Sequence, residues 1–193
     1  MKVLGITGGI GSGKSTVCKI FETFGIPVYS ADDRAKYLMA HDQSLISSIK
    51  NTFGDEAYLQ GKLNRTFLAQ KIFSNAAETS KMNAIVHPAV GEDFKSWMSM
   101  QNAAYVIKEA ALMIESGSYK SLDFLINVFA PIETRIERIK IRDPQRSESE
   151  IKGIIDKQVS EEERSRLSDA IIYNDEKQLL IPQVLAIHQQ FNH

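Results

Sequence analysis

The stretch Gly8-Gly9-Ile10-Gly11-Ser12-Gly13-Lys14-Ser15-Thr16 constrains the fold more than any other part of the sequence. It contains a glycine, four residues and then Gly-Lys-Ser, the pattern of a loop whose backbone N–H groups surround phosphate oxygens. The apolar run 3–7 precedes it and a helical pattern over 15–24 follows it, which is the context that this motif requires. The alternative is a flexible turn of glycine and serine between a strand and a helix.

Each polar group of this motif has a role toward a nucleoside triphosphate. Lys14 would reach the terminal phosphates as a point charge, and the Ser15 hydroxyl would bind a magnesium ion. The helix that begins here would direct its positive end at the same anion. The motif therefore predicts a triphosphate site with bound Mg²⁺.

Composition narrows the classes of protein to which the chain can belong. Its 193 residues, 43% of them apolar, suit one domain with small inserts. With 23 basic and 24 acidic residues and no basic patch, we expect no nucleic-acid partner. Cys18 is the single cysteine, which excludes an internal disulfide and a cysteine zinc site. Without a leader or an 18-residue apolar run, we expect a cytoplasmic protein that does not contact membranes.

Strand and helix patterns alternate along the chain. Predicted strands cover 3–7, 26–30, 103–108, 122–128 and 170–173. The connections are long enough for right-handed crossovers, so we expect a parallel sheet with helices on both faces. Residues 44–101 show helical patterns without clear strands, interrupted at His87-Pro88 because a residue before proline avoids helical geometry. In the charged segment 142–166, Ser147 and Ser160 each precede a glutamate by three residues, which predicts two capped helices that project from the core.

Six further side chains are candidates for a functional role, each with a structural alternative. Asp32 follows the second strand, where parallel sheets bind ligands, although one aspartate can simply cap a helix. Glu109 ends the third strand, where a carboxylate can hold magnesium or its waters, although any strand end can carry an acid. His87 could be catalytic, packed or at the surface. Arg135, Arg138 and Arg142 share one helical stripe, which could equally be a solvated face.

A triphosphate site on such a sheet serves phosphoryl transfer or a hydrolytic switch or motor. Transfer requires positioning, charge neutralisation and a carboxylate to accept the proton of the acceptor hydroxyl, the role that we assign to Asp32. An arginine-bearing lid would exclude water. The chain lacks the Asn-Lys-x-Asp segment of guanine-reading switches. These features favour a kinase.

The ordered motifs resemble those of the dephospho-coenzyme A kinase family, almost from end to end. Besides the loop, the resemblance includes Ala31-Asp32, Leu63-Asn64-Arg65, Ile85-Val86-His87-Pro88, Ala111-Leu112, Glu115, Arg138, Arg142-Asp143, Gln158, Asp169, Ile172 and Asn174. Two positions depart from the family pattern. Ser30 stands where a second aspartate is frequent, and Glu109-Ala110-Ala111-Leu112-Met113 replaces a commoner Asp-x-Pro-Leu-Leu.

The resemblance implies a P-loop nucleotide-kinase fold with a five-stranded parallel sheet flanked by helices. Its core would cover 1–57 and 102–193, with a helical insert at 58–101 for the coenzyme A precursor and a helical lid at 142–160. The implied reaction transfers phosphate from ATP to the ribose 3′-hydroxyl of dephospho-coenzyme A, the last step of coenzyme A synthesis. It would need Mg²⁺ and no obligatory protein partner.

The resemblance also implies roles for individual residues. Asp32, Lys14 and Arg142 would be catalytic, Asp32 and His87 would bind the acceptor, and Ser15 and Glu109 would hold the metal. The residues expected to bind ATP are Gly8, Gly9, Gly11, Ser12, Gly13, Lys14, Ser15, Thr16, Arg138, Arg142 and Asn174. The alternatives are a kinase for another small alcohol, such as a nucleoside, shikimate or gluconate, and a module that senses nucleotide without turning it over.

Overall fold

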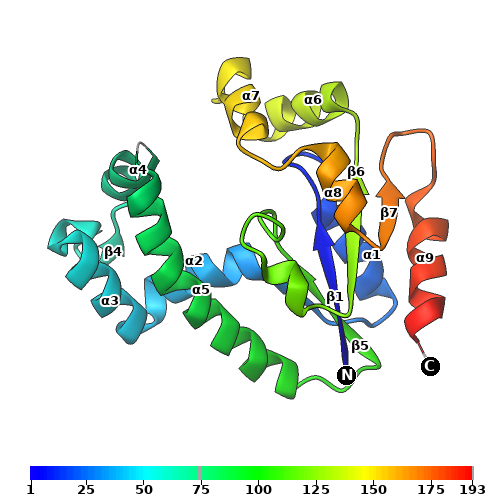
Figure 1. The fold of residues 1–193 in the computed structure, drawn as a ribbon, viewed down its shortest axis with the longest axis horizontal. Coiled ribbons are helices and arrows are strands. Elements are labelled where there is room, and N and C mark those ends of the chain that lie inside the picture. The colour runs from blue at the N-terminus through cyan, green and yellow to red at the C-terminus, as the bar shows by residue number, and fades with distance from the viewer. Residues whose placement is uncertain (74, 193) are drawn as a thin grey trace. The chain divides into compact units, whose positions relative to one another are not determined.

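The computed structural model describes residues 1–73 and 75–192, and its centre is a five-stranded sheet (Figure 1). The strands are β1 (Lys2–Thr7), β2 (Val28–Ser30), β5 (Tyr105–Glu109), β6 (Phe124–Phe129) and β7 (Ala170–Tyr173). They lie in the order β2-β5-β1-β6-β7, and every neighbouring pair is parallel. The predicted five-stranded parallel sheet is therefore confirmed.

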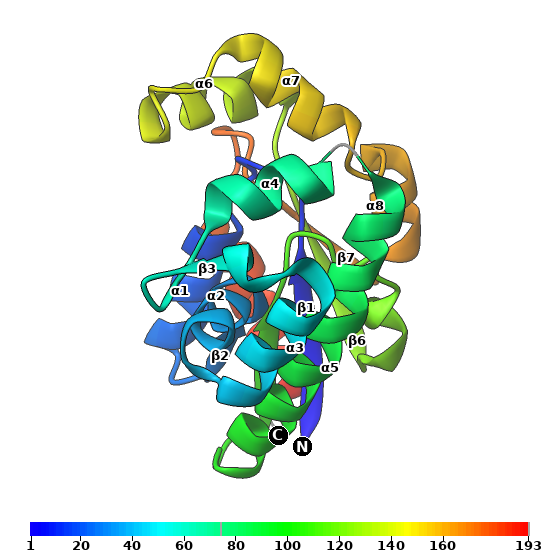
Figure 2. The same ribbon diagram turned by 90° about the vertical axis from the view of Figure 1, so that its left-hand side faces the viewer.

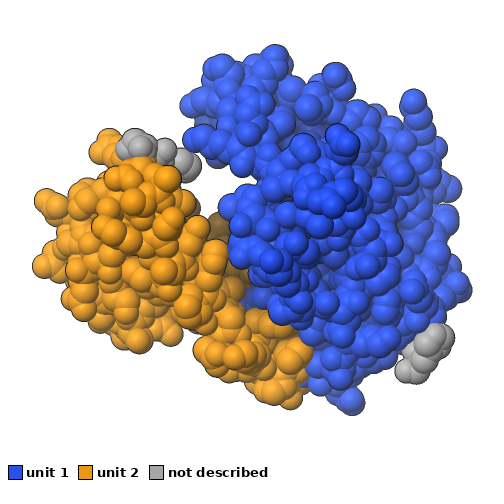
Figure 3. All heavy atoms as spheres, in the orientation of Figure 1, with its two compact units in different colours: residues 1–30, 101–193 blue, residues 31–100 orange. Residues whose placement is uncertain are grey.

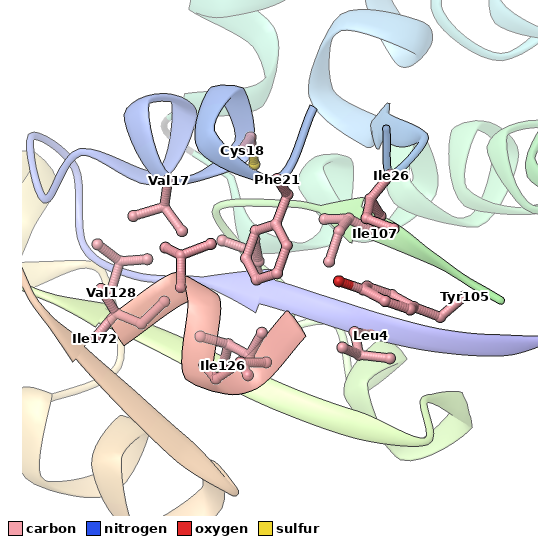
Figure 4. Close-up of a cluster of buried hydrophobic side chains, with 13 residues drawn as sticks. Leu4, Val17, Cys18, Phe21, Ile26, Tyr105, Ile107, Ile126, Val128 and Ile172 are labelled. Carbon is pink, nitrogen blue, oxygen red and sulfur yellow. The ribbon is translucent and has the colours of Figure 1, made fainter. Parts of the chain in front are cut away.

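One face of this sheet is covered by α1 (Lys14–Thr23) and α9 (Leu180–Phe191). Alternate residues of the strands, such as Leu4, Ile107 and Ile126, point to these helices because side chains of a strand alternate between its two faces. Phe21 of α1 lies fully buried among them, as Figure 4 shows. This apolar layer fixes α1 on the sheet and with it the start of the helix at Lys14.

The remaining helices of this part of the chain lie on both sides of β6 in the sequence. The short 3-10 helix η2 (Ser118–Ser121) precedes that strand, and α6 (Ile132–Arg142), α7 (Glu148–Asp156) and α8 (Glu161–Leu167) follow it. Both predicted caps are confirmed: the Ser147 side chain accepts from the Glu150 N–H in a reciprocal capping box, and the Ser160 side chain accepts from the Glu163 N–H.

The chain divides into two compact units, coloured separately in Figure 3. Unit 1 contains residues 1–30 and 101–193, and unit 2 contains Ala31–Met100. Unit 2 thus begins earlier than the insert that the sequence placed at 58–101. The reason lies in α2 (Ala31–His41) and α3 (Gln43–Phe53), whose apolar sides pack on α5 (Ala76–Ser99) rather than on the sheet.

Unit 2 also contains η1 (Asp55–Ala57), a small hairpin of β3 (Tyr58–Leu59) and β4 (Lys62–Leu63), and α4 (Arg65–Phe73). The expectation of helices without strands was wrong at this hairpin. Its turn has positive φ at Gln60 (51°) and Gly61 (77°), which is the conformation of tight two-residue hairpin turns. Figure 2 shows α3 and α4 against α5 within this unit.

The expected interruption at His87-Pro88 was also wrong, since α5 continues through Pro88. Proline lacks the N–H that would bond to the carbonyl of Ala84, and it disfavours helical geometry at His87. Val86, Val90 and Phe94 are all buried, so the packing of both halves of α5 outweighs the local preference. Within the ranges given above, no helix is both long and apolar enough to cross a bilayer.

Candidate active site

The glycine-rich loop joins β1 to α1 in unit 1. Gly8, Gly11 and Gly13 have φ values of 153°, 79° and 94°, a region that residues with a side chain rarely adopt. The Ser12 N–H donates to the Gly9 carbonyl (3.1 Å), which closes a turn, and no side chain caps the start of α1. The helix thus begins at the loop with its positive end open to an anion.

Lys14 crosses the loop from its far end. Its ammonium donates to the carbonyl oxygens of Gly8 (3.0 Å) and Gly9 (3.4 Å). Two loop carbonyls therefore hold the charge of Lys14 over the strand that enters the loop, which suits the predicted contact with terminal phosphates.

The outer side of the loop is packed against protein. A Cβ atom on Gly9 would collide with the Arg135 guanidinium, and one on Gly13 would collide with the Asn174 amide. A Cβ on Gly11 would lie 2.7 Å from the Arg135 carbonyl oxygen. At Gly11 the neighbouring backbone therefore requires glycine, whereas at Gly9 and Gly13 a larger residue would force the Arg135 or Asn174 side chain to move, which the sequence alone did not reveal.

The three arginines of α6 have different surroundings. Arg135 is only 4% exposed, so the solvated face that its charge pattern allowed is wrong at this position. Burial lowers the pKa of Arg135, nearby Arg164 lowers it further, and the Glu161 carboxylate opposes both effects. Arg142, at the end of α6, is exposed and pairs with Asp143 (2.9 Å). Only part of the arginine stripe is thus available to a ligand from solution.

Arg138 belongs to a connected group beside the loop. Its Nη2 donates to the Asn174 carbonyl (3.2 Å) and to the Glu176 carboxylate (3.2 Å), while Asn174 Nδ2 donates to the Ser12 carbonyl (2.8 Å). The structure therefore brings Arg138 and Asn174 to the loop as the sequence predicted, although their contact with ATP stays a prediction.

Two buried polar atoms in this group lack a protein partner. They are Arg138 Nη1 and Ser12 Oγ. A buried polar group without a hydrogen bond costs about 1–3 kcal/mol, a penalty that a polar ligand or a water would remove. Arg138 Nη1 lies 3.9 Å from the position of a Cβ on Gly13, so it is next to the loop. Both atoms are suitable donors for an anion bound there.

Glu109 lies at the carboxyl end of β5, in register with Ile6 of β1. The Ser30 hydroxyl, at the end of β2, donates to Glu109 Oε2 (3.3 Å). Burial raises the pKa of the Cys18 thiol in α1, the charge of Glu109 raises it further, and Lys14 opposes the rise. The Glu109 carboxylate is therefore close to the first helix, on the edge of the sheet where the loop begins.

Asp32 and His87 belong to unit 2. Asp32 is exposed in the first turn of α2, two residues after β2 ends, and neighbouring Asp33 pairs with Lys36 (2.7 Å). His87 lies inside α5, next to Pro88. The roles of Asp32 and His87 stay predictions that depend on the acceptor.

The structure identifies two residues near the loop whose role the sequence did not indicate. Arg135 Nε donates to the Ile10 carbonyl (2.9 Å), and Gln158 Oε1 accepts from the Ile10 N–H (2.9 Å). One signal in the sequence indicated that Arg135 could be buried: it lies four residues before Ile139, so the two side chains share one face of α6. In the structure both are buried, whereas Ile132 is exposed. For Gln158 the only sequence signal was that it is one of the positions at which the sequence resembles the dephospho-coenzyme A kinase family.

Comparison with known proteins decides the family. The family model described as Dephospho-CoA kinase matches residues 2–179. The chain belongs to this family. A Dephospho-CoA kinase of Bacteroides fragilis is 40% identical over 185 residues, which cover 95% of this chain and 90% of that protein. One of Porphyromonas gingivalis is 36% identical over 187 residues, covering 97% and 93% of the two chains.

Solved structures agree on the fold. The crystal structure of TT1252 from Thermus thermophilus has a TM-score of 0.88 at 28% identity, covering 100% of this chain and 98% of that one. A Dephospho-CoA kinase of Campylobacter jejuni has a TM-score of 0.69 at 24% identity, covering 100% and 98%. A shikimate kinase of Acinetobacter baumannii has a TM-score of 0.55 at 15% identity, covering 98% and 92%, which is a likeness of fold alone.

Proposed function

We propose that the chain transfers the γ-phosphoryl group of ATP to the ribose 3′-hydroxyl of dephospho-coenzyme A, giving coenzyme A and ADP. The observation that carries this proposal is the match of the family model over residues 2–179, together with a phosphate loop of the required conformation. The reaction is the last step of coenzyme A synthesis.

The loop supplies the binding of the nucleotide phosphates. Backbone N–H groups at the end of the loop and at the start of α1 would surround the β- and γ-phosphates, with Lys14 neutralising the charge that spreads over the transferred group. Arg138 and Asn174, which contact each other and the loop, would bind the same nucleotide. The unpartnered Nη1 of Arg138 supports this assignment.

Magnesium fits the oxygen donors that unit 1 offers. Mg²⁺ binds proteins through one or two oxygen ligands and keeps several waters. The exposed Ser15 hydroxyl and the Glu109 carboxylate would supply those ligands, and the part of the chain that the structure describes has no cluster of three acidic, histidine or cysteine side chains. When bound, the ion neutralises charge on the β- and γ-phosphate oxygens.

The acceptor hydroxyl needs a group that takes its proton. The carboxylate of Asp32 would accept that proton and orient the oxygen for in-line attack, as general bases do in phosphoryl transfer. Asp32 lies in the first turn of α2, next to the carboxyl end of β2, where ligands of parallel sheets bind. His87 and the other side chains of residues 58–101 would bind the remainder of dephospho-coenzyme A.

Arg142 and the segment 142–160 would complete the site as a lid. In the structure the Arg142 guanidinium is exposed and pairs with the neighbouring carboxylate of Asp143 at 2.9 Å. An exposed ion pair of this kind is worth little, so Arg142 can exchange it for a phosphate at small cost. Closure would exclude water and prevent hydrolysis of ATP.

A panel of acceptors tests the function. Purified protein with ATP and Mg²⁺ is assayed for ADP release with dephospho-coenzyme A, shikimate, gluconate and a nucleoside. We expect release to depend on dephospho-coenzyme A and the product to be coenzyme A. Equal rates with the other alcohols, or ATP binding without acceptor-dependent turnover, would reject the proposal.

Two substitutions test the assigned roles. We expect Asp32→Asn to lower kcat by about 10²–10⁴-fold with ATP affinity nearly intact, because the base acts only on the acceptor. Asp33→Asn, which changes the neighbouring carboxylate of the ion pair with Lys36, is the matched control. Lys14→Ala should weaken ATP binding and turnover together, whereas Lys19→Ala on the same helix should not. Normal turnover in Asp32→Asn would remove Asp32 from the mechanism.

A further inference from the structure

One residue of the phosphate loop, Ile10, is held through both of its backbone polar groups. Gln158 Oε1 accepts the Ile10 N–H at 2.9 Å, and Arg135 Nε donates to the Ile10 carbonyl at 2.9 Å. Arg135 Nη2 also donates to Gln158 Oε1 at 3.5 Å, so the three residues form a closed ring of hydrogen bonds. Neither side chain is among those predicted to contact ATP, Mg²⁺ or the acceptor.

We infer that Arg135 and Gln158 are positioning residues, which hold the phosphate loop in its nucleotide-binding conformation before ATP arrives. Ile10 lies between Gly9 and Gly11, and glycine loses more conformational freedom on ordering than any other residue. A loop ordered only by ATP would lose that entropy at the moment of binding. Fixing Ile10 through both its N–H and its carbonyl removes this cost from the binding step.

Arg135 is itself held rigidly, as this role requires. It is 4% exposed, and its guanidinium lies so close over Gly9 that no Cβ atom could fit between them. Arg164, 2% exposed, lies near it and pairs with Glu161 at 2.7 Å. The Glu161 carboxylate in turn accepts from Asn127 of β6 at 2.6 Å. An ion pair anchored on the sheet therefore lies near enough to Arg135 for its charges to act on the guanidinium.

The two positioning residues come from the two ends of one segment. Arg135 lies on α6, and Gln158 follows α7 directly after Lys157. The chain between them contains Arg142 and α7, the segment that we propose as the lid. Both ends of that segment therefore contact the same loop residue, Ile10. Hydrogen bonds to Ile10 therefore connect the segment that contains the lid to the phosphate loop.

Three variants test the inference, which rests on the proposed function only for the identity of the ligand. Gln158→Leu removes the acceptor of the Ile10 N–H at similar size, and Gln158→Glu keeps an acceptor that can also pair with Arg135. Arg135→Lys keeps the charge but cannot donate to Ile10 and Gln158 with one planar group. Glu133→Gln, exposed in the first turn of α6, is the control. The measurements are amide hydrogen exchange at Ile10 without ligand, ATP affinity by calorimetry, and steady-state kinetics.

We expect Gln158→Leu to speed exchange of the Ile10 amide in the ligand-free protein by about tenfold, since that donor loses its partner. ATP Kd and the KM for ATP should rise by about five- to tenfold, the value of one hydrogen bond, while kcat and the KM for dephospho-coenzyme A stay within about twofold. Gln158→Glu should restore both readouts, and Arg135→Lys should show intermediate exchange.

The exchange measurement separates this inference from the proposed function, because it needs no ATP. Wild-type exchange at Ile10 in both Gln158→Leu and Arg135→Lys would overturn the inference, whatever the protein phosphorylates. An equal rise in the KM of both substrates would also overturn it, since that pattern indicates a general loss of structure. If Gln158→Leu fails to fold, exchange at Ile10 in Arg135→Lys decides.

Discussion

The ion pair of Arg164 and Glu161 gives a prediction about stability. Burial alone suggests that losing Arg164, the more buried partner, would destabilise the protein more, and we predict the opposite. The Arg164 side chain is 2% exposed and donates to Glu161 (2.7 Å), whereas the Glu161 side chain is 28% exposed. Arg164 also donates to the Val159 carbonyl (2.8 Å), and Glu161 also accepts from Asn127 (2.6 Å). We predict that removing the more exposed partner, Glu161, destabilises the protein more.

The magnitude follows from what each substitution leaves behind. Glu161→Met leaves the buried Arg164 cation with one carbonyl and removes the closer of the two acceptors of the fully buried Asn127 amide, the other being Ser165 Oγ at 3.2 Å. We therefore expect a loss of about 3 kcal/mol, the lower part of the range for a broken buried pair. Arg164→Met leaves a carboxylate that water reaches and that Asn127 still donates to, so we expect about 1–2 kcal/mol. The double variant should lose less than the sum.

Thermal and denaturant unfolding of the four proteins measure these differences. For a chain of this length about 1 kcal/mol corresponds to about 2–4 °C in Tm, so Glu161→Met should melt about 6–12 °C lower. The double-mutant cycle then gives the coupling between the two side chains. Arg164→Met as damaging as Glu161→Met, or a double variant equal to the sum, would refute the reasoning.

Three further predictions concern the core, the sheet edge and α7. Phe21→Ala should lower the free energy of unfolding by about 3–5 kcal/mol in denaturant titrations, because Phe21 is fully buried; a loss under 1 kcal/mol would contradict the packing. Asp169→Ala should cost about 1–3 kcal/mol, since its carboxylate accepts the Leu125 N–H at 2.7 Å, and Asp169→Asn should recover part of this. Hydrogen bonds from Lys140 and Lys152 lower the pKa of Glu148 to about 2, so this ionised pairing persists at neutral pH and is lost as pH falls toward 2. Lys140→Gln should raise the Glu148 pKa in a carboxyl NMR titration; no change would contradict the contact.

Much of the fold could be predicted because local patterns and sheet topology agree. The loop motif required a strand before it and a helix after it, and the structure has β1 and α1 there. The serine caps of α7 and α8 depend on residues three apart, so sequence alone identifies them. Such features need no knowledge of distant parts of the chain.

The predictions that were wrong depend on contacts between residues that are distant in the sequence. From the sequence alone, Arg135 is indistinguishable from an exposed charged residue. Its hydrogen-bond partners Ile10 and Gln158 are remote in sequence, and only the structure brings them together. Pro88 predicts a break that burial on both sides prevents. The early start of unit 2 depends on α2 and α3 packing against α5, a choice of partner that periodicity cannot reveal.

The contact between Gly9 and the Arg135 guanidinium bears on how the loop can diverge among relatives. Gly9 is one of the four variable residues of the motif, yet here an arginine on α6 occupies the space that a methyl group would need. A larger residue at position 9 therefore requires the Arg135 guanidinium to move, which a shorter residue at position 135 would avoid. The two positions should covary, and a chain that replaces both must find another means to fasten its loop.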